Sequence, residues 1–81
     1  MKIYDFNGSK NVSGKRIRRA RQALKMSQEN LAARLQLEGV VIERDSVSRI
    51  EIGTRFVADY ELLALSKILG VSPAYLLGLE D

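Results

Sequence analysis

The stretch SQENLAARLQLEGVVIERDSVSRIEIG, residues 27–53, decides the fold. Its first part predicts a helix over Gln28–Leu35. The serine just before this segment can cap a helix, and Leu31, Ala32 and Leu35 then share one apolar face.

Helical spacing returns in the last part of the stretch, from Arg44 to about Ile52. Val47 and Ile50 fall on the inward face of this second helix. Gly53 can end it in the left-handed conformation that glycine adopts readily. Two short amphipathic helices joined by an irregular segment are therefore expected.

The segment between these helices, Gln36–Glu43, is predicted to be an extended turn. Gly39 should break a helix, and the β-branched residues after it are too few for a sheet. Two paths are open. We favour the one in which the first helix gains a turn through Glu38 and stops at Gly39. In the other, the segment loops outward with Val40 and Ile42 folded back onto the core.

An arm and a further helix precede this pair. Residues 1–11 are polar and rich in turn formers, which predicts a flexible N-terminal arm. From residue 13 to residue 25, Ile17, Ala20 and Leu24 form an apolar stripe and the basic side chains lie off it. This pattern predicts an amphipathic helix.

Two more helices are expected after the pair. Leucines at helical spacing predict a helix over Tyr60–Leu69, and a serine followed by proline predicts a short one over Pro73–Leu77. A chain of 81 residues suffices for one small domain, which we place at residues 12–79. The expected architecture is all-α, with five helices and a long turn between the second and the third.

The residues that the chain lacks exclude several kinds of site. With no cysteine and no histidine, the sequence offers no disulfide, thiolate nucleophile or imidazole base. Its acidic residues are scattered over the predicted helices, so we expect neither an enzyme nor a metal, cofactor or small-molecule site. The apolar runs are far shorter than the roughly 20 residues of a membrane span, and no signal-peptide pattern follows Met1. We therefore expect no membrane association and a cytoplasmic location.

Charge is distributed unevenly along the chain. Residues 1–35 contain nine lysines and arginines against two acidic residues, a net charge of +7, whereas residues 36–81 contain four against eight, a net charge of −4. A basic half is typical of a small domain that binds nucleic-acid phosphates. The alternative is a solvated helix face, which has the same composition.

The two central helices have the spacing of a unit that reads double-stranded DNA. In a helix-turn-helix, one helix braces across the phosphates and the second presents polar side chains to the major groove. The helix over residues 44–52 exposes five side chains that can reach a phosphate or a base edge: Arg44, Asp45, Ser46, Ser48 and Arg49.

Three short motifs follow one another along the chain: Ser27-Gln28-Glu29-Asn30-Leu31-Ala32, Arg49-Ile50-Glu51-Ile52-Gly53 and Leu69-Gly70-Val71-Ser72. Through them the chain resembles, over residues 14–78, the Cro/C1-type (XRE-like) helix-turn-helix family of phage and bacterial repressors. The resemblance implies a lambda-repressor-like domain and a sequence-specific transcriptional regulator, most often a repressor.

The resemblance also implies roles for single residues. It places at the DNA Ser27, Gln28, Arg44, Asp45, Ser46, Ser48, Arg49, Thr54 and Arg55, and the basic first helix adds Lys15 and Arg19. Two alternatives are that Asp45 caps its helix and that Gln28 is a solvated amide. Arg21 and Glu51 match a pair that forms a structural ion pair beneath the DNA-facing surface.

The sequence departs from the family in the turn. Nine residues separate Leu35 from Asp45, about five more than in the common form. Glu43 is also a poor capping residue. These two departures leave the first residue of the second helix of the pair open.

A dimer and a different function complete the expectations. Proteins of this type commonly bind DNA as two-fold dimers, and Tyr75, Leu76 and Leu79 offer an apolar C-terminal surface for that contact. The alternative is that Tyr75 is a half-buried edge of the core. The other candidate function is a protein-binding module of the same fold, such as an antitoxin or an adaptor, whose binding need not weaken steeply with salt.

Overall fold

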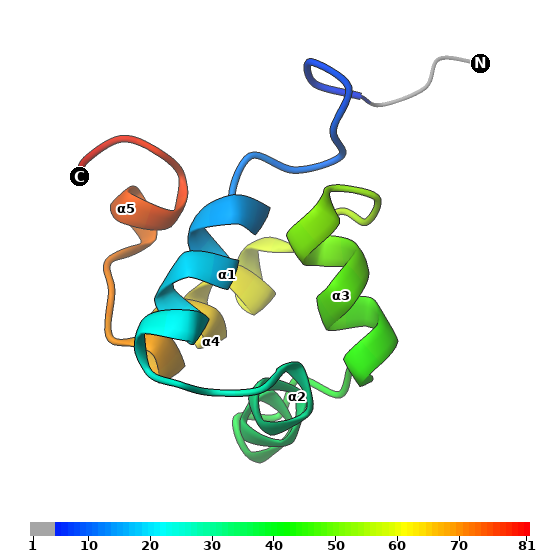
Figure 1. The fold of residues 1–81 in the computed structure, drawn as a ribbon, viewed down its shortest axis with the longest axis vertical. Coiled ribbons are helices and arrows are strands. Elements are labelled where there is room, and N and C mark those ends of the chain that lie inside the picture. Colours follow the sequence, from blue (N-terminus) through cyan, green and yellow to red (C-terminus); the bar gives the residue numbers. More distant parts are fainter. Residues whose placement is uncertain (1–4) are drawn as a thin grey trace.

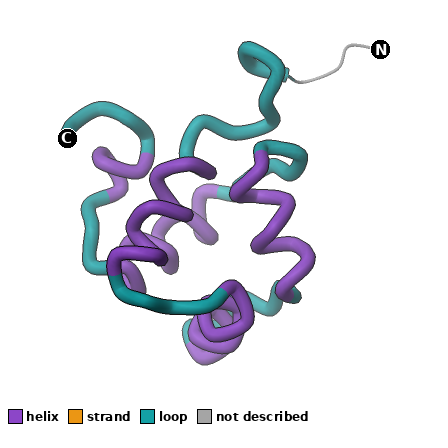
Figure 2. Tube along the Cα trace, in the orientation of Figure 1, coloured by secondary structure: helices purple, strands orange, loops and turns teal. Residues whose placement is uncertain are grey.

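The computed structural model describes residues 5–81, and these form five helices joined by loops (Figures 1 and 2). The helices are α1 Gly14–Ala23, α2 Gln28–Leu37, α3 Arg44–Ile52, α4 Asp59–Leu69 and α5 Pro73–Leu76. Between residues 5 and 81 there is no strand, only an isolated bridge between Phe6 and Ser9. The predicted all-α fold is confirmed. None of these helices has the length and apolar character that crossing a membrane requires.

One core is shared by all five helices. Its most deeply buried apolar side chains are Ile17 from α1, Leu31 and Leu35 from α2, Val47 and Ile50 from α3, Leu65 from α4 and Leu76 from α5. Burying a side chain of this size stabilises the folded chain by about 1.5–3 kcal/mol. Because each helix is short, its place depends on these few contacts.

The end of α1 differs from the predicted stripe. Leu24, expected on the apolar face, is about half exposed. The helix ends at Ala23, and Lys25 takes a left-handed conformation with φ of 55° that turns the chain. Met26 is buried after this turn.

The turn between α2 and α3 combines features of both predicted paths. As in the favoured path, α2 is prolonged, with Glu38 as its C-cap and Gly39 at φ of 85°. The Val40 N–H closes the end by donating to the Leu35 carbonyl at 2.9 Å. As in the other path, Val40 is buried and Ile42 packs against the core. These apolar contacts fix the path of a segment that sequence spacing left open.

The last three residues of the predicted arm are bound to the rest of the chain. Residues 1–4 lie outside the described part of the chain. Lys10 donates its backbone N–H to the Gly53 carbonyl at 2.8 Å, and the hydroxyl of Ser9 lies 3.4 Å from the same oxygen. Because the end of α3 offers carbonyls without helical partners, residues 9–11 bind there and belong to the domain.

Candidate nucleic-acid interface

The outer face of α3 holds the predicted reading side chains. Arg44, Asp45 and Arg49 are exposed, whereas Ser46 and Ser48 are partly buried. No residue in the described part of the chain forms an ion pair with the three exposed charges, and none of its backbone N–H groups bonds to the Asp45 carboxylate. Asp45 therefore does not cap α3 in this structure, and all three groups are free to meet a ligand.

A buried ion pair joins the reading helix to α1. Nε of Arg21 donates to Oε2 of Glu51 at 2.7 Å, and a second guanidinium nitrogen donates to Oε1 at 2.9 Å. This hydrogen bonding raises the pKa of Arg21 above its usual value. The guanidinium also donates to the Met26 carbonyl at 2.7 Å. The predicted Arg21–Glu51 pair is present, and both residues are less than one-tenth exposed.

Gln28 at the start of α2 is tied to the same pair. Its Nε2 donates to Oε1 of Glu51 at 3.0 Å, so α1, α2 and α3 meet in one hydrogen-bonded group. Gln28 is thus not merely a solvated amide. Its side-chain carbonyl still has lone pairs to offer, and its amide has a second N–H.

A basic surface on α1 adjoins this group. Lys15, Arg18 and Arg19 are exposed and, with Gln22 on α1 and Ile52 on α3, line a hollow of about 480 Å³ beside the ion pair. The sequence analysis named Lys15 and Arg19. It omitted Arg18, although a position three residues after Lys15 lies on the same side of a helix.

The two hydroxyl residues at the helix ends remain accessible. Ser27 is exposed, and its Oγ accepts the Asn30 N–H at 3.0 Å as the cap of α2. Thr54 is also exposed, with Oγ1 at 3.4 Å from the Arg49 carbonyl. The Ser27 hydroxyl keeps its proton to donate to a phosphate, and the Thr54 hydroxyl can turn its proton from the long bond to Arg49 to do the same.

Arg55, predicted to lie near a phosphate, forms an ion pair within the protein. Its guanidinium makes two hydrogen bonds to the Glu61 carboxylate, at 3.0 and 3.1 Å, and one to the Phe56 carbonyl at 2.9 Å. Glu61 also accepts the Ala58 N–H at 2.9 Å. Burial alone would raise the pKa of the Glu61 carboxyl, but these hydrogen bonds hold it below the usual value. Arg55 therefore braces the start of α4 and makes three hydrogen bonds within the protein.

The predicted apolar surface at the C-terminus is only partly formed. Leu76 is completely buried, so its assignment to an exposed interface is wrong. Tyr75 is half-buried, and the Arg16 guanidinium carbon lies 5.7 Å from the centre of its ring. Leu79 is 77% exposed. Of the three, Leu79 alone presents a mostly free side chain.

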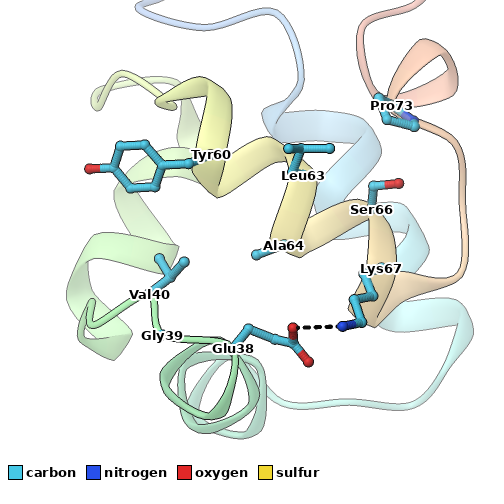
Figure 3. Close-up of a pocket in the computed structure, with 9 residues that line it drawn as sticks. All are labelled: Glu38, Gly39, Val40, Tyr60, Leu63, Ala64, Ser66, Lys67 and Pro73. Atoms are coloured by element: carbon cyan, nitrogen blue, oxygen red, sulfur yellow. Dashed lines mark ion pairs between the residues drawn. The ribbon is translucent and has the colours of Figure 1, made fainter.

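A second hollow lies in front of α4 (Figure 3). It occupies about 670 Å³ between α4 and the end of α2, with Tyr60 and Leu63 on its rim. The ion pair between Lys67 and Glu38, at 3.1 Å, crosses its lower edge. In Figure 1 this helix lies behind α1, and the two hollows have no lining residue in common.

Comparisons with known proteins agree with this arrangement. Residues 17–76 match the family model described as helix-turn-helix. None of the curated proteins matches the chain. Among solved structures, the P22 c2 repressor in complex with a synthetic operator is similar, with 37% sequence identity and a TM-score of 0.67. The match covers 86% of this chain and 98% of that one. The chain therefore belongs to the Cro/C1-type helix-turn-helix family.

Proposed function

We propose that this chain is a transcriptional repressor that binds double-stranded operator DNA with α3 in the major groove. In this role Arg44, Asp45 and Arg49 meet base edges. The phosphates on either side are bound by Ser27, Gln28 and Thr54 and by the basic residues of α1. Promoters and operators of bacteria and phages lie in the cytoplasm, where we expect the protein to act.

One observation carries the proposal. The exposed face of α3, the start of α2 and the cations of α1 adjoin a single hydrogen-bonded group, Arg21–Glu51–Gln28. A major-groove reader needs this combination, because base edges and flanking phosphates must be met at once by rigidly connected helices. The similar P22 c2 repressor is itself recorded with an operator.

Selection of bound sites from random DNA tests the proposal. We expect a recurring sequence to be enriched, and binding to it should weaken steeply with salt because phosphate contacts release counterions. Recovery of no preferred sequence, with binding that is insensitive to salt, would contradict it. That outcome would favour the protein-binding alternative, for which the rim of the α4 hollow offers exposed Tyr60 and Leu63.

We further propose that the chain binds as a two-fold dimer through its C-terminal end. Leu79 and Leu77 supply exposed apolar surface there, and Tyr75 lies beside them. The selected site should then be a palindrome whose half-sites lie about 10 to 10.5 base pairs apart. Leu79→Asp should abolish cooperative occupation of the two halves while leaving binding to one half-site intact. Cooperativity that survives this change would exclude the surface.

A further inference from the structure

Asn11, from the segment predicted to be a free arm, joins three parts of the domain. Its Nδ2 donates to the Ile50 carbonyl at 3.0 Å and to the Arg55 carbonyl at 2.8 Å. Its Oδ1 accepts the Gly14 N–H at 2.8 Å. Both N–H groups of the amide and its oxygen are thus used at once, an arrangement that neither a carboxylate nor a hydroxyl can reproduce.

The groups that Asn11 binds lie at the ends of two helices and in the loop after α3, and the Ile50 carbonyl also accepts the Gly53 N–H at 3.1 Å. Gly14 is the first residue of α1, where the backbone N–H has no helical partner. Ile50 lies in the last turn of α3, and Arg55 lies in the loop that follows. One side chain therefore satisfies the beginning of α1, the end of α3 and the loop toward α4.

The backbones at this junction approach closely. A Cβ at Gly14 would lie only 2.2 Å from the Ile50 carbonyl oxygen, and one at Gly53 would lie 2.5 Å from Oγ of Ser9. Contacts this close leave no space for another side chain to replace the amide. The separation between the end of α3 and the start of α1 is thus set by the residues that bind across it.

We infer that Asn11 is a positioning residue for DNA reading: it fixes the C-terminal end of α3 against α1. The helix has nine residues and is held in the core by Val47 and Ile50. Arg49 lies next to Ile50, whose carbonyl Asn11 binds. A base contact depends on the placement of such a side chain to within a fraction of an ångström, whereas a phosphate contact by a long flexible lysine does not.

This inference rests on the proposed function, so its test compares selected-site DNA with random DNA. Asn11→Ser keeps an oxygen that can accept the Gly14 N–H but loses the donors to Ile50 and Arg55. Asn11→Ala loses all three bonds. We expect either change to lower affinity for the selected site about tenfold, the size expected for the loss of one carbonyl's partner, because the Ile50 carbonyl keeps the Gly53 N–H. Affinity for random DNA and the salt dependence should stay as in the unchanged protein.

A matched control separates positioning from general loss of stability. Ser66→Ala removes a hydrogen bond from the Ser66 side chain on α4 to the Val71 carbonyl, which lies between α4 and α5. It should leave the ratio of selected-site to random affinity unchanged. If Asn11→Ala does not fold, the Ser variant decides. A ratio that stays at the unchanged protein's value in Asn11→Ser would overturn the inference.

Hydrogen exchange of the free protein gives a readout that needs no DNA. The Gly53 and Thr54 N–H groups donate to the Arg49 carbonyl at the end of α3. In Asn11→Ser we expect both amides to exchange about tenfold faster, while those of α4 are unaffected. If the amides exchange faster in Asn11→Ser but the unchanged protein selects no DNA sequence, the proposed function is refuted. The role of Asn11 in holding the end of α3 would still be supported. Unchanged exchange together with an unchanged affinity ratio would refute the positioning role.

Discussion

At the scale of single residues, Arg49 is an exposed side chain on a helix that is anchored in the core. It lies on the outer face of α3, between the buried Ile50 and the partly buried Ser48. An arginine so placed can pair with guanine through two hydrogen bonds. Arg49→Ala should therefore cost about 1–3 kcal/mol of binding free energy on the selected site and relax preference at one base position. Repeating the site selection with the variant measures both. An unchanged base preference would rule out this contact.

Arg21 and Glu51 form a pair whose halves depend on each other. Both are buried, so Arg21→Met would leave the Glu51 charge without its partner, at a cost of about 3–5 kcal/mol in the free energy of unfolding. Joint replacement with Glu51→Leu should recover much of this loss, because no uncompensated charge then remains. Urea denaturation of the two variants tests the coupling. Equal stability of the single and double variants would contradict it.

At the scale of elements, the start of α4 is predicted to be sensitive to pH. The pKa of Glu61 is lowered in the folded protein, so its ionised form stabilises the fold above the unfolded pKa of about 4.3. This contribution is lost as the pH falls through the lowered value. Glu61→Gln should cost about 1–2 kcal/mol at pH 7 and markedly less in strong acid, by urea denaturation. Ser66→Ala, which removes a hydrogen bond between groups that do not ionise, is the control and should cost the same at both pH values.

Local patterns predicted the helices well and the contacts between them less well. Gly39 and Gly53 end α2 and α3 as their sequence positions suggested, because a left-handed cap depends on the residue itself. Asn11 binds residues 39 and 44 positions further along the chain, which no periodicity can reveal. Likewise Leu76 is buried and its neighbour Leu77 is not. The difference in burial depends on how α5 packs against the core, and it cannot be predicted from two adjacent leucines.

At the scale of the whole molecule, the cations are unevenly distributed over the surface. Lys15, Arg18 and Arg19 gather on α1, whereas Lys67 lies across the molecule on α4, paired with Glu38. If α1 follows the DNA backbone, each of its cations neutralises about one phosphate. Replacing Lys15, Arg18 or Arg19 by Ala should then reduce the slope of log affinity against log salt by about 0.9.

The reduction of the salt slope should be equal on selected and random DNA, because the phosphates are the same whatever the base sequence. Lys67→Ala changes the net charge of +3 by the same amount and is the matched control. Because its ammonium lies beside Glu38 at the end of α2 and not on α1, it should leave the salt slope where it was. A salt titration of all four variants on both DNAs separates a local phosphate surface from a general effect of net charge. Suppose that Lys67→Ala lowered the salt slope as much as Arg18→Ala does. The attraction to DNA would then depend on the net charge of the whole molecule, and the proposed contact of α1 with the DNA backbone would be wrong.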